Sequence, residues 1–225
     1  MLALFFASAV CVLLLVARII QTRDLGYGTL IWNLFLAWLP LVFALFACEQ
    51  SRKSEKFSWR LWTLAGAWLL FFPNAPYIFT DLIHLTARFY RHFWVDMVLI
   101  LMCALTGLII GFLSLYLMQT IVTRWFGRLT SWMFIAVSAA LGSFGIYLGR
   151  FLRLNSWDVI TQPVKLYHDI GSWTNRSGYF PTSVAFPILF AAFLFIAYLM
   201  LYALTHLSPA QYAGSTQAAE GSGKA

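Results

Sequence analysis

The stretch WLLFFPNAPYIFTDLIHL combines an apolar run, interrupted by two prolines, with polar residues that could do chemistry. Pro73 and Pro76 interrupt the run, and Asp81 and His84 follow. A carboxylate and an imidazole three residues apart lie close together on a helix, and such a pair can transfer protons. The stretch therefore predicts a broken helix that carries two candidate catalytic residues, Asp81 and His84.

The prolines should free backbone groups inside the run. Neither ring can donate a hydrogen bond, so the carbonyls of Leu69 and Phe72 lose their usual helical partners. In a bilayer such carbonyls must be buried in protein or face a wet cavity. We expect Asn74 to cap a second half-helix, with Pro76 in its first turn.

The second half-helix would present a polar face. Tyr77, Asp81, His84 and Arg88 follow one another at spacings of four, three and four residues, which places them on one side of an α-helix. Broken helices that point into a cavity are a recurring ligand-site device in membrane proteins. A simple proline kink, with the Asp-His pair among the lipid headgroups, is the alternative.

A second polar cluster follows a glycine-containing run, in the segment GIYLGRFLRLNSWDV. Arg150 and Arg153 lie about one turn apart there, and charges near a membrane are costly unless paired. Their planar guanidinium groups could hold an anionic ligand. Alternatively, the two arginines could form structural salt bridges. The candidate protein partners are Asp81, Asp96 and Asp158.

Nearly all aspartates and the three non-terminal histidines thus fall at one membrane face, where we predict a pocket that binds an anion or a lipid. The predicted ligand-binding residues are Asn74, Tyr77, Arg88, Asp96, Arg150, Arg153, Asn155 and Asp158. No HExxH-like spacing is present, so neither a metal nor a cofactor is predicted. The cysteines, none in a CxxC pair, are expected to be packing residues: Cys11, Cys48 and Cys103.

Composition places these residues in a membrane protein, since 61% of the chain is hydrophobic, 10% is charged and the mean hydropathy is +0.78. A helix needs roughly 20 apolar residues to span a bilayer. About six runs are long enough: Leu2–Ile20, Leu25–Cys48, Trp59–Phe79, Trp94–Met118, Trp132–Leu152 and Phe180–Leu204. The first lacks the basic start of a signal peptide and is expected to be a retained helix.

The predicted fold is therefore all-α, a polytopic bundle of about six transmembrane helices, with the third helix broken at Pro73 and Pro76. Residues 1–207 form one domain with a long loop near 153–179, and residues 208–225 form a disordered tail. Small residues should let the fourth and fifth helices pack together: Ala104, Gly107, Gly111 and Ser114, facing Ser138, Gly142, Gly145 and Gly149.

The net charge of +7 does not indicate a nucleic-acid partner, because the basic residues are scattered at helix ends. Membrane lipids are the expected partners, with an anionic small molecule or headgroup at the pocket. Lys and Arg are almost equally numerous on the two sides of the membrane. Setting aside the last loop and its flanking arginines favours cytoplasmic termini.

The segments FPNAPYIFTDLIHL and GIYLGRFLRLNSWDV resemble the bacterial membrane-protein family catalogued as domain of unknown function 1361. The resemblance extends from about the second helix to Pro163. It implies an uncharacterised bacterial multi-pass membrane protein, and it assigns no catalytic residues. We expect the protein in the bacterial inner membrane.

Three functions remain open from the sequence. A non-catalytic scaffold or lipid-binding role is favoured, because it needs no further chemistry. An intramembrane enzyme would use Asp81 and His84 on a lipid or another anionic substrate held by Arg150 and Arg153. A small-molecule transporter would use the broken helix and Asn33, but no internal repeat supports it.

Overall fold

A computed structural model describes residues 1–53, 58–87, 93–151 and 180–206, together with residues 161, 164 and 171. Four predicted ligand-binding residues lie outside the described residues, as do the side chain of His84, the tail over 208–225 and most of the long loop: Arg88, Arg153, Asn155 and Asp158. The elements are α1 (Leu2–Thr22), η1 (Leu25–Tyr27), α2 (Gly28–Lys53), α3 (Trp59–Phe71), α4 (Asn74–Tyr77), η2 (Ile78–Ala87), α5 (Phe93–Phe126), α6 (Arg128–Phe151) and α9 (Phe180–His206).

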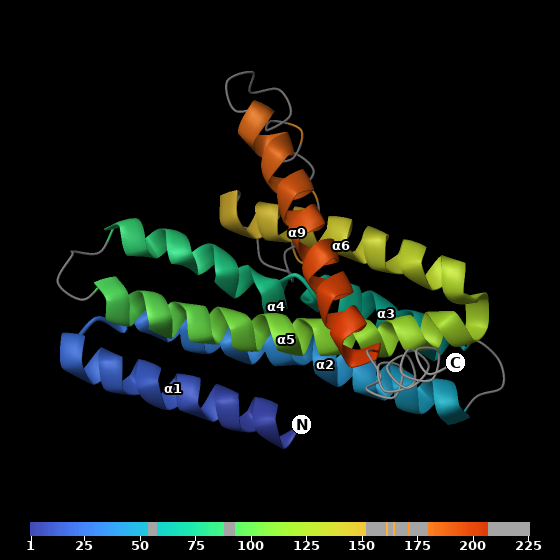
Figure 1. Cartoon of the computed structure of the whole chain (residues 1–225), viewed down its shortest axis with the longest axis horizontal. Coiled ribbons are helices and arrows are strands. Elements are labelled where there is room, and N and C mark those ends of the chain that lie inside the picture. Colours follow the sequence, from blue (N-terminus) through green and yellow to red (C-terminus); the bar gives the residue numbers. More distant parts are fainter. Residues whose placement is uncertain are drawn as a thin grey trace, which may run out of the picture.

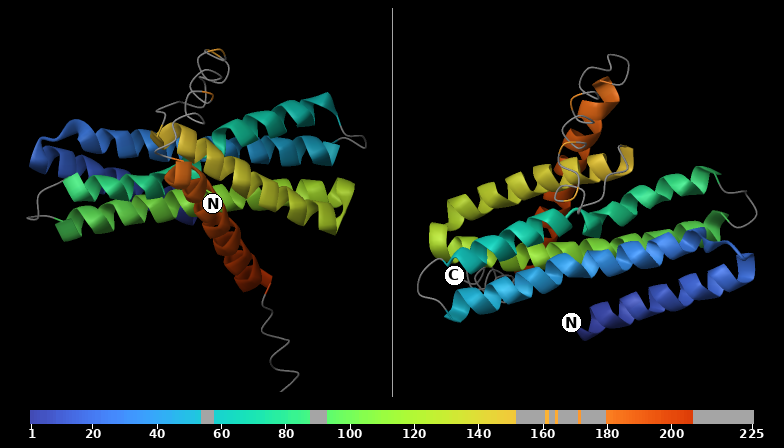
Figure 2. Two further views of the ribbon diagram at one scale, coloured as in Figure 1. Left: turned by 90° about the horizontal axis from the view of Figure 1, so that it is seen from above. Right: turned by 180° about the vertical axis from the view of Figure 1, so that it is seen from behind.

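The described part of the chain is helical and contains no strand, as the composition predicts. Five helices are long and apolar enough to cross a membrane: α1, α2 with η1, α5, α6 and most of α9. The sixth predicted crossing is divided among α3, α4 and η2. These elements run along the bundle with α2 and α5, whereas α9 crosses it obliquely (Figures 1 and 2). The multi-pass helical fold of a membrane protein is confirmed.

The third crossing breaks at the first proline, between α3 and α4. The amide of Ala75 donates to the Phe72 carbonyl at 3.2 Å, and that of Tyr77 to the Pro73 carbonyl at 3.1 Å. Asn74 does not cap α4 as predicted. Its side-chain amide instead donates backward to the Phe71 carbonyl at 3.0 Å, because the amide of Ala75, the usual helical donor to that carbonyl, has turned to Phe72.

The segment after the break is wound more tightly than the predicted half-helix. One α-helical turn, α4, leads into η2, a 3₁₀-helix of 10 residues. A 3₁₀-helix rises about 2.0 Å per residue, against about 1.5 Å in an α-helix. The same residues therefore reach further toward the membrane face, and positions three apart, such as Asp81 and His84, are eclipsed along the axis.

Glycines of α5 lie against the backbone at the break. A Cβ atom on Gly107 would lie 2.8 Å from the carbonyl oxygen of Ala75, and one on Gly111 would lie 2.8 Å from the Cβ of Ala75. No real Cβ atom approaches that closely, so only glycine allows α5 to pack here. Trp68 adds a polar tie from α3, since its indole N–H donates to Ser114 on α5 at 3.1 Å.

Glycines of α6 cover the other side of the same segment. A Cβ on Gly142 would lie 2.8 Å from the Phe72 ring, and one on Gly145 would lie 2.7 Å from the Pro73 ring. The helices α5 and α6 do contact each other, as predicted. Their glycines, however, do not face one another but enclose the broken segment between them, because its rings and backbone need the space that a missing side chain leaves.

Substituting one of these glycines should loosen the bundle. Gly107→Ala places a methyl group against a backbone oxygen that cannot rotate away, and overpacking of this kind costs about 1–3 kcal/mol. Gly66→Ala is the matched control, because a Cβ there meets nothing within 4 Å. We expect a lower thermal midpoint in detergent for Gly107→Ala and an equal or higher midpoint for Gly66→Ala. Equal losses would contradict the packing.

Candidate functional site

A buried ion pair joins the segment after the break to α6. The Nη1 of Arg150 lies 3.0 Å from Oδ1 of Asp81, and the two side chains are 15% and 7% exposed. Asn33 on α2 donates from Nδ2 to the other carboxylate oxygen at 3.0 Å. The Arg150 guanidinium also lies 6.0 Å from the ring centroid of Tyr77. Residues from α2, α4, η2 and α6 thus meet at one point.

Each partner in this cluster offsets the cost of burying the others. An isolated carboxylate in an apolar interior is strongly disfavoured, and one that is paired and hydrogen-bonded is tolerated. Both oxygens of Asp81 have a donor, and Tyr77 offers the cation an aromatic face. The cluster therefore fixes Asp81, and with it η2, against α2 and α6.

Asn33 is the member of this cluster that sequence reasoning assigned to no ligand site. We expected it only in the path of a transporter. In the structure Asn33 binds Asp81, whereas Asn74 binds the Phe71 carbonyl. The signal was a lone amide in the apolar stretch IWNLFLAW, since a polar side chain in a membrane helix needs a partner.

Asp96 belongs to a second ion pair, separate from the first. The guanidinium of Arg18 on α1 donates through Nε to Oδ1 at 2.8 Å and through Nη2 to Oδ2 at 3.2 Å. Its Nη1 donates to Oε1 of Gln21 at 2.9 Å, and the ring centroid of Tyr27 lies 6.0 Å away. This two-pronged pair fastens the end of α1 to the start of α5.

The structure thus divides the predicted pocket. It brings together Tyr77, Asp81 and Arg150, and it places Asp96 and Asn74 elsewhere. We predicted Asp81, Asp96 or Asp158 as a partner of Arg150, and the described partner is Asp81. Arg18 was missed, although an arginine inside an apolar run, two residues before its end, is itself a sign of a buried partner.

An aromatic cavity adjoins Arg150. It has a volume of about 390 Å³ and lies between η2, α6 and α9. In its wall the ring centroids of Phe79 and Phe193 lie 5.6 Å apart, and those of Phe151 and Phe186 lie 5.3 Å apart. The described residues that line it are Phe79, Thr80, Arg150, Phe151, Phe186, Phe190 and Phe193. The cavity is therefore apolar except at the guanidinium and one hydroxyl.

The chain was compared with known protein families, curated proteins and solved structures. Residues 32–200 match a family model described as a protein of unknown function, DUF1361. The chain belongs to this family. Neither a curated protein nor a solved structure matches the chain. The matched DUF1361 region includes the broken segment, Asp81 and Arg150, and it begins after Arg18.

Breaking the Asp81–Arg150 pair should cost far more than breaking an exposed pair. Asp81→Asn or Arg150→Leu removes the described counterion of a largely buried charge, and breaking such a pair typically costs about 3–5 kcal/mol. In the double variant neither charge is left, so we expect its loss to be smaller than the sum of the single losses. Unfolding in detergent by chemical denaturant measures all three.

Lys53→Ala is the control for this cycle, because Lys53 and Glu49 form an exposed pair with side chains 69% and 61% exposed. Such pairs contribute little to stability, and we expect no measurable change. Strictly additive losses for Asp81 and Arg150 would mean that the two residues do not interact in the folded protein.

Proposed function

We propose that this DUF1361 protein is a non-catalytic membrane component that binds an anionic lipid, or another anionic amphiphile, in the aromatic cavity beside Arg150. The observation that supports this most is the placement of one guanidinium in a cavity otherwise lined by phenylalanines and one threonine. Apolar walls with a few oriented polar groups are typical of ligand sites. A guanidinium suits phosphate and carboxylate, and the rings suit an acyl chain.

The surroundings of Asp81 favour binding over catalysis. A general base must reach the proton that it removes, whereas Asp81 accepts hydrogen bonds from Asn33 and Arg150 at 3.0 Å each. Those contacts give the carboxylate a structural task and keep a negative charge beside Arg150. The use of Asp81 and His84 as an acid-base pair remains a prediction, and we favour the scaffold or lipid-binding role.

The location proposed for this role is a bacterial inner membrane with both termini in the cytoplasm. Five apolar helices and the broken third crossing support an integral membrane protein with an even number of crossings. The basic residues of the links after α2 and α5 favour the cytoplasmic side for those links. The pocket would then lie toward the opposite face.

Arg150→Ala should reduce retention of an anionic lipid, measured by native mass spectrometry of protein exchanged into detergent with phosphatidylglycerol or phosphatidylcholine. Loss of one charge-assisted contact typically costs about 1.5–3 kcal/mol, so we expect roughly a tenfold to hundredfold loss for phosphatidylglycerol. Phosphatidylcholine should be retained less by the wild type and should respond less to the change.

Arg128→Ala is the matched control, since Arg128 is exposed at the opposite end of the same helix. Arg150→Lys separates folding from binding, because lysine keeps a cation opposite Asp81 but lacks the planar fork. It should fold and bind at an intermediate level. Equal retention by Arg150→Ala and Arg128→Ala, both folded, would refute the proposal.

A further inference from the structure

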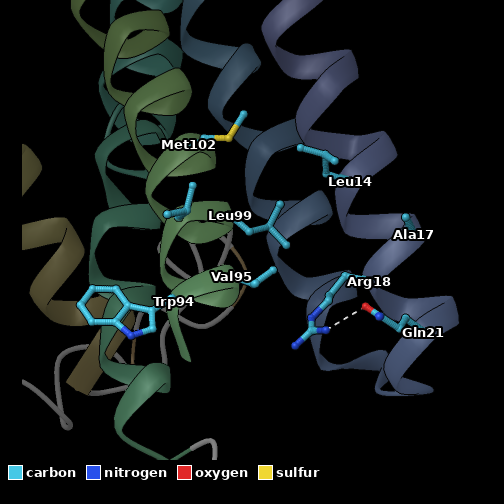
Figure 3. Close-up of a pocket in the computed structure, with 9 residues that line it drawn as sticks. Leu14, Ala17, Arg18, Gln21, Trp94, Val95, Leu99 and Met102 are labelled. Atoms are coloured by element: carbon cyan, nitrogen blue, oxygen red, sulfur yellow. Dashed lines mark hydrogen bonds between the residues drawn. The ribbon is translucent and has the colours of Figure 1, made fainter. Parts of the chain in front are cut away.

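A larger cavity lies between α1 and α5, around the second ion pair. It has a volume of about 630 Å³ (Figure 3), within the usual range for small-molecule sites. Leu14 and Met102 lie toward one end of it, and Arg18, Gln21 and Trp94 toward the other (Figure 3). Several of its apolar residues are exposed, including Trp94 at 72% and Val98 at 50%. The cavity therefore opens onto the outer surface of the bundle, where lipid lies.

The orientation of the Gln21 amide is fixed by its neighbour. Arginine has only donors, so the Gln21 atom that faces Nη1 of Arg18 at 2.9 Å must be the oxygen. The amide nitrogen is left with its two donors, and among the described residues it has no hydrogen-bond acceptor. Gln21 thus offers donors at the polar end of the cavity.

Charge at this end is already balanced. Arg18 is 6% exposed, and Asp96 accepts from it through both carboxylate oxygens. The pair contributes no net charge to the cavity. A ligand here would therefore be chosen for an acceptor oxygen rather than for a negative charge.

The extent of the cavity favours a lipid over a protein helix. Leu14 to Gln21 on α1, and Trp94 to Met102 on α5, each cover roughly 10–12 Å at about 1.5 Å per residue. That is less than half of a hydrocarbon core about 30 Å thick. A packed partner helix would need a continuous face along the whole core. A lipid molecule in one leaflet matches the length of the cavity, and its polar headgroup and apolar chain lie in the same order as the polar and apolar ends of the cavity.

We infer that the cavity between α1 and α5 binds a glycerophospholipid whose ester or phosphate oxygen accepts a hydrogen bond from the Gln21 amide. Its acyl chain lies against Leu14, Val98 and Met102. Because Arg18 and Asp96 neutralise each other, the site takes zwitterionic and anionic lipids alike. It also joins α1, which lies outside the matched family region, to α5 through a bound lipid.

Photo-crosslinking in vesicles tests this site. The protein is reconstituted in phosphatidylcholine and phosphatidylglycerol vesicles with a trace of either lipid bearing a diazirine in its acyl chain, and labelled peptides are mapped by mass spectrometry. We expect both probes to label Leu14 and Met102. Val98→Trp should abolish this labelling because the indole occupies the cavity, and Leu101→Trp, a non-lining position 43% exposed on the same helix, should not.

Gln21→Glu tests the hydrogen bond itself. Glutamate keeps an oxygen for Arg18 but replaces the amide donors with a second acceptor. Labelling of Leu14 should fall about fivefold, as expected for the loss of one neutral hydrogen bond. Arg128→Ala, at an exposed position at the start of α6, should leave it unchanged.

Two results would overturn the inference: equal labelling of Leu14 in folded Val98→Trp and Leu101→Trp, or a disulfide between two copies of Val98→Cys, which would assign the cavity to a second protein. If Val98→Trp does not fold, undiminished labelling in Gln21→Glu would overturn it equally.

Discussion

The break at Pro73 imposes the constraint on which the rest of the bundle depends. A membrane-spanning backbone must have its polar groups satisfied or enclosed, and a proline removes a donor in the middle of the crossing. The chain meets this requirement locally, with the Asn74 amide on the Phe71 carbonyl. Tertiary packing also meets the requirement, because the glycines of α5 and α6 let these two helices pack closely against the break on two sides.

The enclosure explains where the charges lie. Once α6 packs on the break, its last turn brings Arg150 to Asp81, which follows one turn beyond Tyr77. The ends of α1, η2 and α6 and the start of α5 then point toward the same end of the bundle (Figure 1). Two buried ion pairs result, each beside a cavity. A guanidinium and phenylalanines line one cavity, and the Gln21 amide and aliphatic side chains line part of the other, so we propose different contacts to lipid in each.

The sequence predicted the membrane-protein class, the transmembrane segments and the break in the third one, because hydropathy and the effect of proline act locally. It identified Asp81 and Arg150 as possible partners, because buried charges are costly unless they are paired. It missed Arg18 as the partner of Asp96, and Asn33 as that of Asp81, since those pairings depend on which helices become neighbours. It also directed the glycines of α5 and α6 toward each other, because spacing shows that a helix can be approached closely but not by which element.

The most direct test of this account is whether the break lies against α5. In a chain with its three native cysteines replaced, Ala75→Cys and Gly111→Cys would place two Cβ atoms 2.8 Å apart. A disulfide can therefore form once the two segments separate by about 1 Å, to the usual Cβ separation of about 3.8 Å. Mild oxidation followed by peptide mapping should yield the Ala75–Gly111 crosslink, and the Gly66→Cys/Gly111→Cys pair should yield none. Absence of the first crosslink in the folded protein, or equal yield of both, would contradict the enclosed break.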